Sequence, residues 1–212
     1  YTYVTGGNLM ALSTFLATGG PDDIGAQVTV SQAIANGVVS LQRIQGRPPN
    51  EAWDYNGPGV DLSTTQFATA GLAAAENIIE GASATLLQLP PFLQFRTQPD
   101  GGLTYRGQGD TSSSSMSATG IWCFRLAQIP AGDPTVQRPL SWMRQNYTYD
   151  RMVGGGFTPT STFYYFWAFT KSVAVSADDG LGGGIYAESF GDRDPALLGY
   201  PEESPSQYFD MA

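Results

Sequence analysis

The chain has no histidine and a single cysteine among its 212 residues. Without an imidazole there is no Ser-His-Asp or Cys-His relay, no histidine general base and no imidazole metal ligand. Cys123 lies between Trp122 and Phe124, so it cannot form an internal disulfide, and its apolar neighbours favour a buried thiol over a nucleophile. We therefore expect no zinc and no other metal, and the sequence indicates no cofactor.

Charged residues are also scarce, at 14% of the chain against the usual quarter or so. The formal net charge is −9, and the ten cations are nine arginines and Lys171, scattered without a cluster. Nucleic acids and anionic membrane surfaces are therefore unsuitable partners, because nothing neutralises their phosphates. No apolar run approaches the roughly 18 residues of a membrane span. The 42% of hydrophobic residues is typical of a globular protein with a sizeable core.

Two segments share one pattern of residue types at a regular spacing. Each begins at an aromatic turn, continues through glycine, and leads by way of Asp, Ser and Thr into a run of small residues. Tyr55 and Tyr105 are 50 positions apart, and Asp61 and Asp110 are 49 apart. A weaker copy follows at 155–175, and half a copy precedes at 5–16. Such a repeat predicts an array of similar supersecondary units.

Each unit is predicted to be a pair of helices joined by a glycine-rich turn. The repeated segments predict helices that end near Ile79, Leu126 and Val175, and the intervening helical segments are 24–45, 84–98 and 134–146. Residues 63–66 match a capping box, which marks a helix start. Pro90 and Pro91 predict a late start or a kink, and Pro139 predicts that the regular part of its helix is delayed.

The sequence thus divides into repeated helical hairpins over 1–175 and an acidic segment rich in Gly and Pro over 176–212. The second segment holds eight of the nineteen acids against one cation, and it reads as a long irregular loop that leads into a further helix. The chain begins at Tyr1 rather than Met and stops at Ala212 in what reads as the opening of another element. We interpret it as a piece of a longer protein, so its compartment is undetermined.

The repeat resembles the prenyltransferase and squalene-oxidase repeat of the terpenoid cyclase and protein prenyltransferase superfamily. The best copies are 98–105 with Asp110, Thr111 and Ser112, and 53–55 with 61–66. The resemblance covers most of residues 1–175. It implies an all-α fold, an α/α toroid in which an inner ring of helices lies within an outer ring and encloses an apolar cavity. Four hairpins are visible, so the expected ring is incomplete.

None of the catalytic residue sets of that superfamily is present in this sequence. The cyclases use an Asp-x-Asp-Asp string, and the nearest strings, at 21–23 and 177–179, lack its first Asp. The protein prenyltransferases hold zinc with Asp, Cys and His, and the related thioester proteins need Cys-Gly-Glu-Gln, whereas Cys123 precedes Phe124. The leading hypothesis is therefore a non-catalytic repeat domain that binds an apolar or isoprenoid molecule or a protein surface. The alternatives are a terpenoid cyclase whose acid lies outside this piece, and a carbohydrate-active toroid that uses paired carboxylates.

Seven side chains are candidates for ligand contact. They are Tyr55, Asp61, Tyr105, Asp110, Phe163, Tyr165 and Trp167. Asp61 and Asp110 precede two helices, where a carboxylate could face a cavity but is also favoured as a helix cap. The aromatic residues of 163–169 leave no polar face, which predicts a helix buried all round, either in the core or against a cavity where the rings could contact a lipid or a cation.

Overall fold

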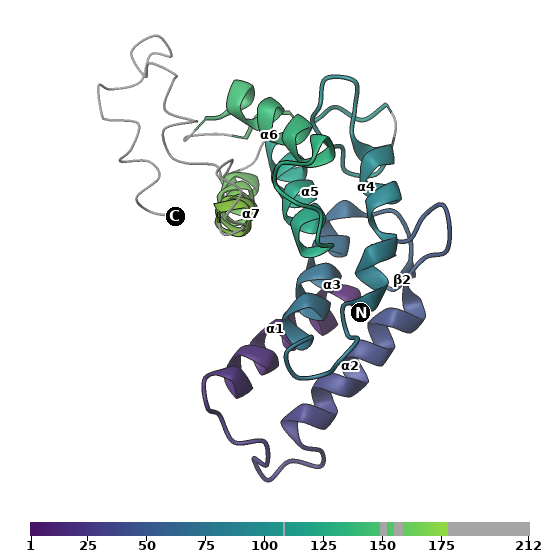
Figure 1. Cartoon of the computed structure of the whole chain (residues 1–212), viewed down its shortest axis with the longest axis vertical. Coiled ribbons are helices and arrows are strands. Elements are labelled where there is room, and N and C mark those ends of the chain that lie inside the picture. Colours follow the sequence, from purple (N-terminus) through teal and green to yellow (C-terminus); the bar gives the residue numbers. More distant parts are fainter. Residues whose placement is uncertain (108, 149–151, 155–158, 178–212) are drawn as a thin grey trace, which may run out of the picture. The chain divides into compact units, whose positions relative to one another are not determined.

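The computed structural model describes residues 1–107, 109–148, 152–154 and 159–177 (Figure 1). The regular elements of these residues are helices apart from one short hairpin, which confirms the predicted all-α class. The elements in chain order are α1 (Thr2–Ala17), α2 (Val30–Ile44), β1 (Trp53–Asp54), β2 (Gly57–Pro58), α3 (Leu62–Ala75), the 3₁₀ turn η1 (Ala84–Gln88), α4 (Pro90–Arg96), α5 (Ser114–Leu126), α6 (Pro134–Asn146) and α7 (Pro159–Ala177).

Contacts divide the chain into two compact units, each of which includes segments that are distant in sequence. The first comprises Tyr1–Arg96, Tyr105–Gln108 and Leu126–Gln128. The second comprises Thr97–Thr104, Gly109–Arg125 and the described residues from Ile129 onward. Most of the predicted acidic segment, from 178 to 212, lies outside the described residues.

In the first unit, α1 and α3 pack closely because glycines face one another across the contact. A Cβ added at Gly71 would lie 2.7 Å from the carbonyl oxygen of Gly6, and one at Gly6 would collide with the carbonyl of Phe67. Leu9 fills the space beside them and is 1% exposed. A glycine inside a helix destabilises it by about 1 kcal/mol relative to alanine. The close contact between the two helices explains why Gly6 and Gly71 are present despite this cost.

Helix α2 covers this pair through a stripe of buried residues at helical spacing, namely Val30, Ile34, Val38 and Leu41. Its start is fixed by a capping box between Thr29 and Gln32, and the Asp22 carboxylate accepts hydrogen bonds from the N–H and the hydroxyl of Ser31. The helix therefore begins later than the predicted residue 24.

The next two helical segments end and begin where local chemistry interrupts the backbone pattern. Helix α3 stops at Ala75, before the predicted Ile79, because the Glu76 carboxylate accepts from the N–H groups of Gly81 and Ser83 and folds the chain back. Helix α4 begins at Pro90 after the separate turn η1, which confirms the late start predicted from the two prolines.

In the second unit, α5 is buried along nearly its whole length, and α6 has the predicted bounds. The prediction that Pro139 delays α6 is wrong. Asp133 caps the helix at Pro134, and the helix continues through Pro139. Arg125, near the end of α5, donates from Nε and Nη2 to the carbonyl of Val175 at 3.1 and 3.0 Å, which ties α5 to the end of α7.

Helix α7 is buried on one face only, which corrects the prediction that it is buried all round. Tyr165 is 0% and Phe169 6% exposed, whereas Phe163 is 76% exposed. The reason is geometric: positions 165 and 169 are one turn apart and share a face, and residue 163 projects from another.

Candidate functional site

The hairpin of β1 and β2 is anchored to the first turn of α3 by hydroxyl groups. The N–H of Trp53 donates to Thr65 Oγ1 at 3.1 Å, and Thr64 Oγ1 donates to the Trp53 carbonyl at 3.0 Å. The Trp53 indole is fully buried, and its Nε1 donates to the carbonyl of Leu41 at 2.9 Å. A hairpin of two-residue strands is too short to be stable alone, so these contacts fix its position.

Asp61 lies at the centre of this region and caps α3. Its Oδ1 accepts from the N–H of Thr64 at 2.9 Å and from Ser63 Oγ at 2.6 Å. The capping residue is therefore Asp61, two positions before Ser63, so the capping box predicted at 63–66 is wrong. Ser63 instead supports the true cap as a donor to its carboxylate.

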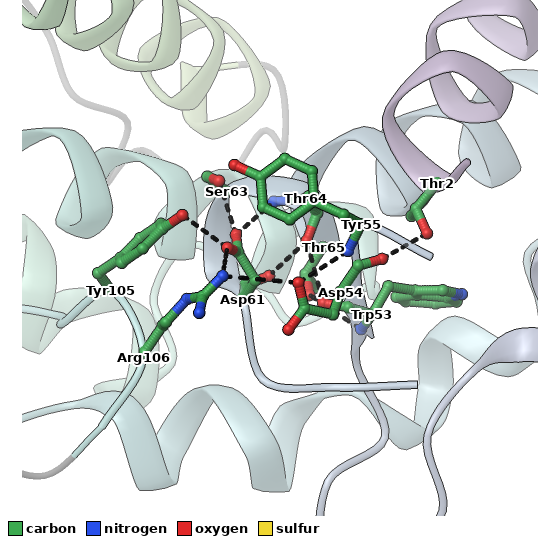
Figure 2. Close-up of polar contacts among 10 residues, drawn as sticks. All are labelled: Thr2, Trp53, Asp54, Tyr55, Asp61, Ser63, Thr64, Thr65, Tyr105 and Arg106. Atoms are coloured by element: carbon green, nitrogen blue, oxygen red, sulfur yellow. Dashed lines mark hydrogen bonds and ion pairs between the residues drawn. The ribbon is translucent and has the colours of Figure 1, made fainter. Parts of the chain in front are cut away.

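The second oxygen of Asp61 binds a tyrosine and an arginine from a distant part of the sequence (Figure 2). The Tyr105 hydroxyl donates to Oδ2 at 2.6 Å, and Arg106 Nη2 donates to it at 3.0 Å. The same Nη2 lies 3.6 Å from Asp54 Oδ1, so the guanidinium bridges two carboxylates. Asp61 is fully buried, whereas the Arg106 side chain is 49% exposed.

This arrangement keeps Asp61 ionised. Burial raises the pKa of the carboxyl, but the hydrogen bonds from Ser63, Tyr105, Thr64 and Arg106 together outweigh it and leave the pKa below its ordinary value. Burial and the hydrogen bond to Asp61 raise the pKa of the Tyr105 phenol, which therefore stays protonated as a donor. The hydrogen bond to Asp61 also raises the pKa of Arg106.

A backbone hydrogen bond of one kind occurs at the starts of three helices. In each case the N–H of the first helical residue donates to the carbonyl of the turn that follows later in the chain. The pairs are Thr2 with Tyr55 at 3.0 Å, Leu62 with Tyr105 at 3.2 Å, and Ser114 with Val153 at 2.8 Å. The acceptors are 50 and 48 positions apart, close to the spacing of the sequence pattern. The first N–H groups of a helix have no partner within it, so each turn completes the preceding helix start.

The structure brings three of the seven predicted site residues together. Tyr55, Asp61 and Tyr105 belong to the first unit, where Tyr55 is 46% exposed and its ring stacks on Tyr3 with centroids 5.8 Å apart. The other four belong to the second unit. Of these, Trp167 makes an edge contact with Trp122 at 5.3 Å, and Tyr165 is fully buried. Contact between any of the seven candidate residues and a ligand stays a prediction.

Asp110 is not the counterpart of Asp61, which corrects the equivalence expected from the sequence. It is exposed and lies four positions before the first residue of α5. Ser113 occupies the position before that helix, and its Oγ accepts from the N–H of Met116 at 3.3 Å. Ser113 therefore takes at α5 the capping position that Asp61 takes at α3.

Sequence reasoning missed Arg106 and a second carboxylate with several donors, the exposed Asp100. Asp100 Oδ1 accepts from Ser112 Oγ at 2.8 Å and from the N–H of Gly102 at 3.0 Å, and its Oδ2 accepts from Trp142 Nε1 at 3.1 Å. The one available signal was position in the sequence, because Asp100 lies in the turn that leads to the candidate Tyr105 and Arg106 directly follows that tyrosine.

Comparisons with protein-family models, with curated proteins and with solved structures give no match for the chain. Across the described residues, no helix is both long and apolar enough to cross a membrane. The described side chains also include no group of three or more Cys, Asp and Glu residues that could hold a metal ion.

Proposed function

We propose that this chain is a helical-repeat domain of the α/α-toroid class whose role is to bind a protein surface rather than to catalyse a reaction. The proposal rests chiefly on one observation: both oxygens of the buried Asp61 carboxylate already accept hydrogen bonds from this chain, and the donors are Ser63, Thr64, Tyr105 and Arg106.

The toroid class is supported by the recurrence of one contact. In three places a helix start binds the next aromatic or apolar turn through its first N–H. Helices with this contact alternate with α2, α4 and α6 along the chain, as inner and outer helices of a toroid would alternate. Repeat architectures combine such identical local units with contacts between neighbours.

The state of Asp61 argues against acid chemistry at this site. A general acid must carry a proton near neutral pH, and enzymes achieve this by raising the carboxyl pKa. The donors around Asp61 lower it instead. In addition, the carboxylate is fully buried and its two oxygens hold four hydrogen bonds, so a substrate has no route to displace them at low cost.

The same reasoning disfavours a glycosidase role for the neighbouring pair of carboxylates. Asp54 and Asp61 both contact Arg106 Nη2, at 3.6 and 3.0 Å, so they are close enough to resemble a glycosidase pair. Such enzymes need one protonated carboxyl and one free carboxylate. Here the surrounding donors hold Asp61 in its ionised form, and that carboxylate is fully buried.

The surface above Asp61 has the composition of a protein-binding site. We name it the Tyr–Arg surface, defined as Tyr55, Tyr105 and Arg106. The Arg106 guanidinium carbon lies 5.3 Å from the centre of the Tyr105 ring, and Tyr55 is supported from beneath by Tyr3. Tyrosine and arginine are the residues most often found at the energetic centres of interfaces. Because Asp61 holds two of them in place, less conformational freedom is lost on binding.

The binding role can be tested with peptides selected from a random displayed library against the wild-type protein. We expect Tyr55→Ala to weaken the selected peptides about tenfold, the effect of losing one interface anchor. Val39→Ala is the control, since Val39 is 63% exposed on α2 and lies outside the Tyr–Arg surface. Peptides that bind both variants as tightly as the wild type would contradict the proposal.

A second arm tests for catalysis directly. The protein is incubated with squalene, with prenyl diphosphates and with polysaccharides, and extracts are analysed by mass spectrometry. We expect no product. A product that is lost in Asp61→Asn, in a variant shown by circular dichroism to be folded, would identify Asp61 as a catalytic acid and overturn the reasoning above.

A further inference from the structure

Asp54 lies beside the Tyr–Arg surface and, unlike Asp61, is not surrounded by donors. Its Oδ1 accepts from the N–H of Tyr55 at 2.8 Å, and Arg106 Nη2 lies 3.6 Å from the same oxygen, beyond hydrogen-bond length. Its Oδ2 accepts no hydrogen bond from any residue that the structure describes, and in Figure 2 this oxygen has no contact with the other residues drawn. The side chain is 34% exposed, so a group from outside the chain can reach Oδ2.

The glycine at position 59 leaves room for this carboxylate. A Cβ added at Gly59 would lie 2.4 Å from the Cβ of Asp54 and 3.0 Å from its Oδ2. Gly59 is not among the glycines with positive φ, so its backbone conformation does not itself require glycine. A larger residue at this position would push against Asp54, and the glycine therefore keeps Oδ2 where it is accessible.

An exposed aromatic ring adjoins the carboxylate in the sequence. Tyr55 is 46% exposed, and its ring stacks on Tyr3 with an angle of 21° between the planes. Tyr3 in turn contacts Phe67, with ring centres 4.1 Å apart, so the exposed ring rests on a fixed aromatic base. A guanidinium group can stack on the face of such a ring and donate its N–H groups to a neighbouring carboxylate.

We propose that the partner of the Tyr–Arg surface is a basic peptide segment, one arginine of which stacks on the Tyr55 ring and donates to Asp54 Oδ2. This inference rests on the proposed function, because it names the partner of the same surface. Arginine fits better than lysine, since its planar group can stack and donate at the same time. The ammonium group of lysine is a compact and strongly hydrated charge.

Charge favours a basic partner, although Arg106 opposes an incoming cation. Arg106 Nη2 lies nearer to Asp61, at 3.0 Å, than to Asp54, at 3.6 Å. Two carboxylates and one guanidinium sum to −1, so the local balance stays negative. The whole chain carries −9, which attracts a basic segment and repels an acidic one.

The test begins with the sequences of the peptides selected against the wild-type protein, in which we expect arginine to be enriched over the starting library. Exposed ion pairs are weak, so Asp54→Asn should weaken these peptides about fivefold while the amide oxygen still accepts from the Tyr55 N–H. Their affinity for the wild type should also fall as salt is raised. Glu80→Gln is the matched control, because it removes the same charge from an exposed residue of the same unit and should change affinity by less than about twofold.

Replacement of the peptide arginine by glutamine isolates the contact. This change should weaken binding to the wild type about tenfold, because stacking and the ion pair are both lost, but should cost only about twofold in Asp54→Asn, where the ion pair is already absent. Circular dichroism checks that this variant is folded. Replacement by lysine, measured on the wild type alone, should weaken binding several fold.

Three results would overturn the arginine contact: selected peptides that lack arginine, equal losses from the glutamine replacement in wild type and Asp54→Asn, or lysine peptides that bind as tightly as arginine peptides. The proposed function fails by a different result, namely binding that Tyr55→Ala leaves unchanged. Peptides that are weakened by Tyr55→Ala but not by Asp54→Asn would therefore refute only the contact proposed for Asp54.

Discussion

Asp61→Asn is the sharpest test of how the first unit is held together. Asparagine has the same shape and can still cap a helix, but it offers one acceptor oxygen where the carboxylate offers two. One side of Asp61 faces Ser63 Oγ and the Thr64 N–H, and the other faces the Tyr105 hydroxyl and Arg106 Nη2. Whichever way the amide is turned, its NH₂ group meets two donors and both lose their acceptor.

The expected cost follows from those contacts. A hydrogen bond to a charged group contributes about 1.5–3 kcal/mol, and a buried donor left without an acceptor costs about 1–3 kcal/mol. Arg106 is half exposed and can turn toward water, so the loss of its hydrogen bond to Asp61 lowers the free energy of unfolding by less than the loss of a buried one. We therefore expect Asp61→Asn to lower the free energy of unfolding by about 2–4 kcal/mol at pH 7, measured by urea denaturation with tryptophan fluorescence.

The pH dependence adds a second criterion. The pKa of Asp61 is lower in the folded than in the unfolded protein, so its stabilisation is fully present above the unfolded value of about 3.9 and is lost as pH falls through the folded pKa. The difference between wild type and variant should therefore shrink in acid. Asp110→Asn, at an exposed carboxyl four positions before α5, should change stability by no more than about 0.5 kcal/mol. Equal losses in the two variants, or a difference that does not vary with pH, would refute the reasoning.

Three further substitutions test other contacts, each by urea denaturation. Tyr105→Phe removes one donor to Asp61 and should cost about 1–2 kcal/mol, and a neutral result would mean that the hydroxyl bond contributes nothing net. Thr29→Ala removes the capping box of α2 and should cost about 1 kcal/mol; retention of full stability would show that the hydrogen bonds that Asp22 accepts from Ser31 suffice. Gly154→Ala should cost about 2 kcal/mol or more, because φ is +72° and the methyl group would collide with the carbonyl of Ser112, and a stable variant would rule out that close approach.

The parts of the fold that were predicted correctly depend on signals close together in the sequence. Helix α6 has the predicted bounds because Pro134 suits a first turn and Val136, Leu140 and Met143 recur at helical spacing. The start of α2 was misplaced although its signal was also local, since Thr29 and Gln32 form a capping box. The start of α1 at Thr2 was beyond local reasoning, because the partner of its N–H is the carbonyl of Tyr55.

The candidate site shows the same division between near and distant contacts. Asp61 was recognised as a cap or a ligand from its place before a helix, but the roles of Tyr105 and Arg106 depend on a contact across more than 40 positions. Asp110 was matched to Asp61 by residue type. The connection after Tyr105 is two residues longer than the one after Tyr55, which moves the start of α5 beyond Asp110. Residue patterns locate such a cap only when the connecting loops have equal length.

The hydrogen bonds from helix starts to later turns have a consequence for synthesis on the ribosome. Each of α1, α3 and α5 is completed by a carbonyl that is made only after the whole of its own hairpin has emerged. During synthesis, each of these helices would therefore be completed only when the following repeat has been made. Shortened versions of the protein should accordingly end after a turn rather than after a helix. A chain ending at residue 96 lacks the turn that completes α3, whereas one ending at 107 retains it, together with the two side chains that bind Asp61.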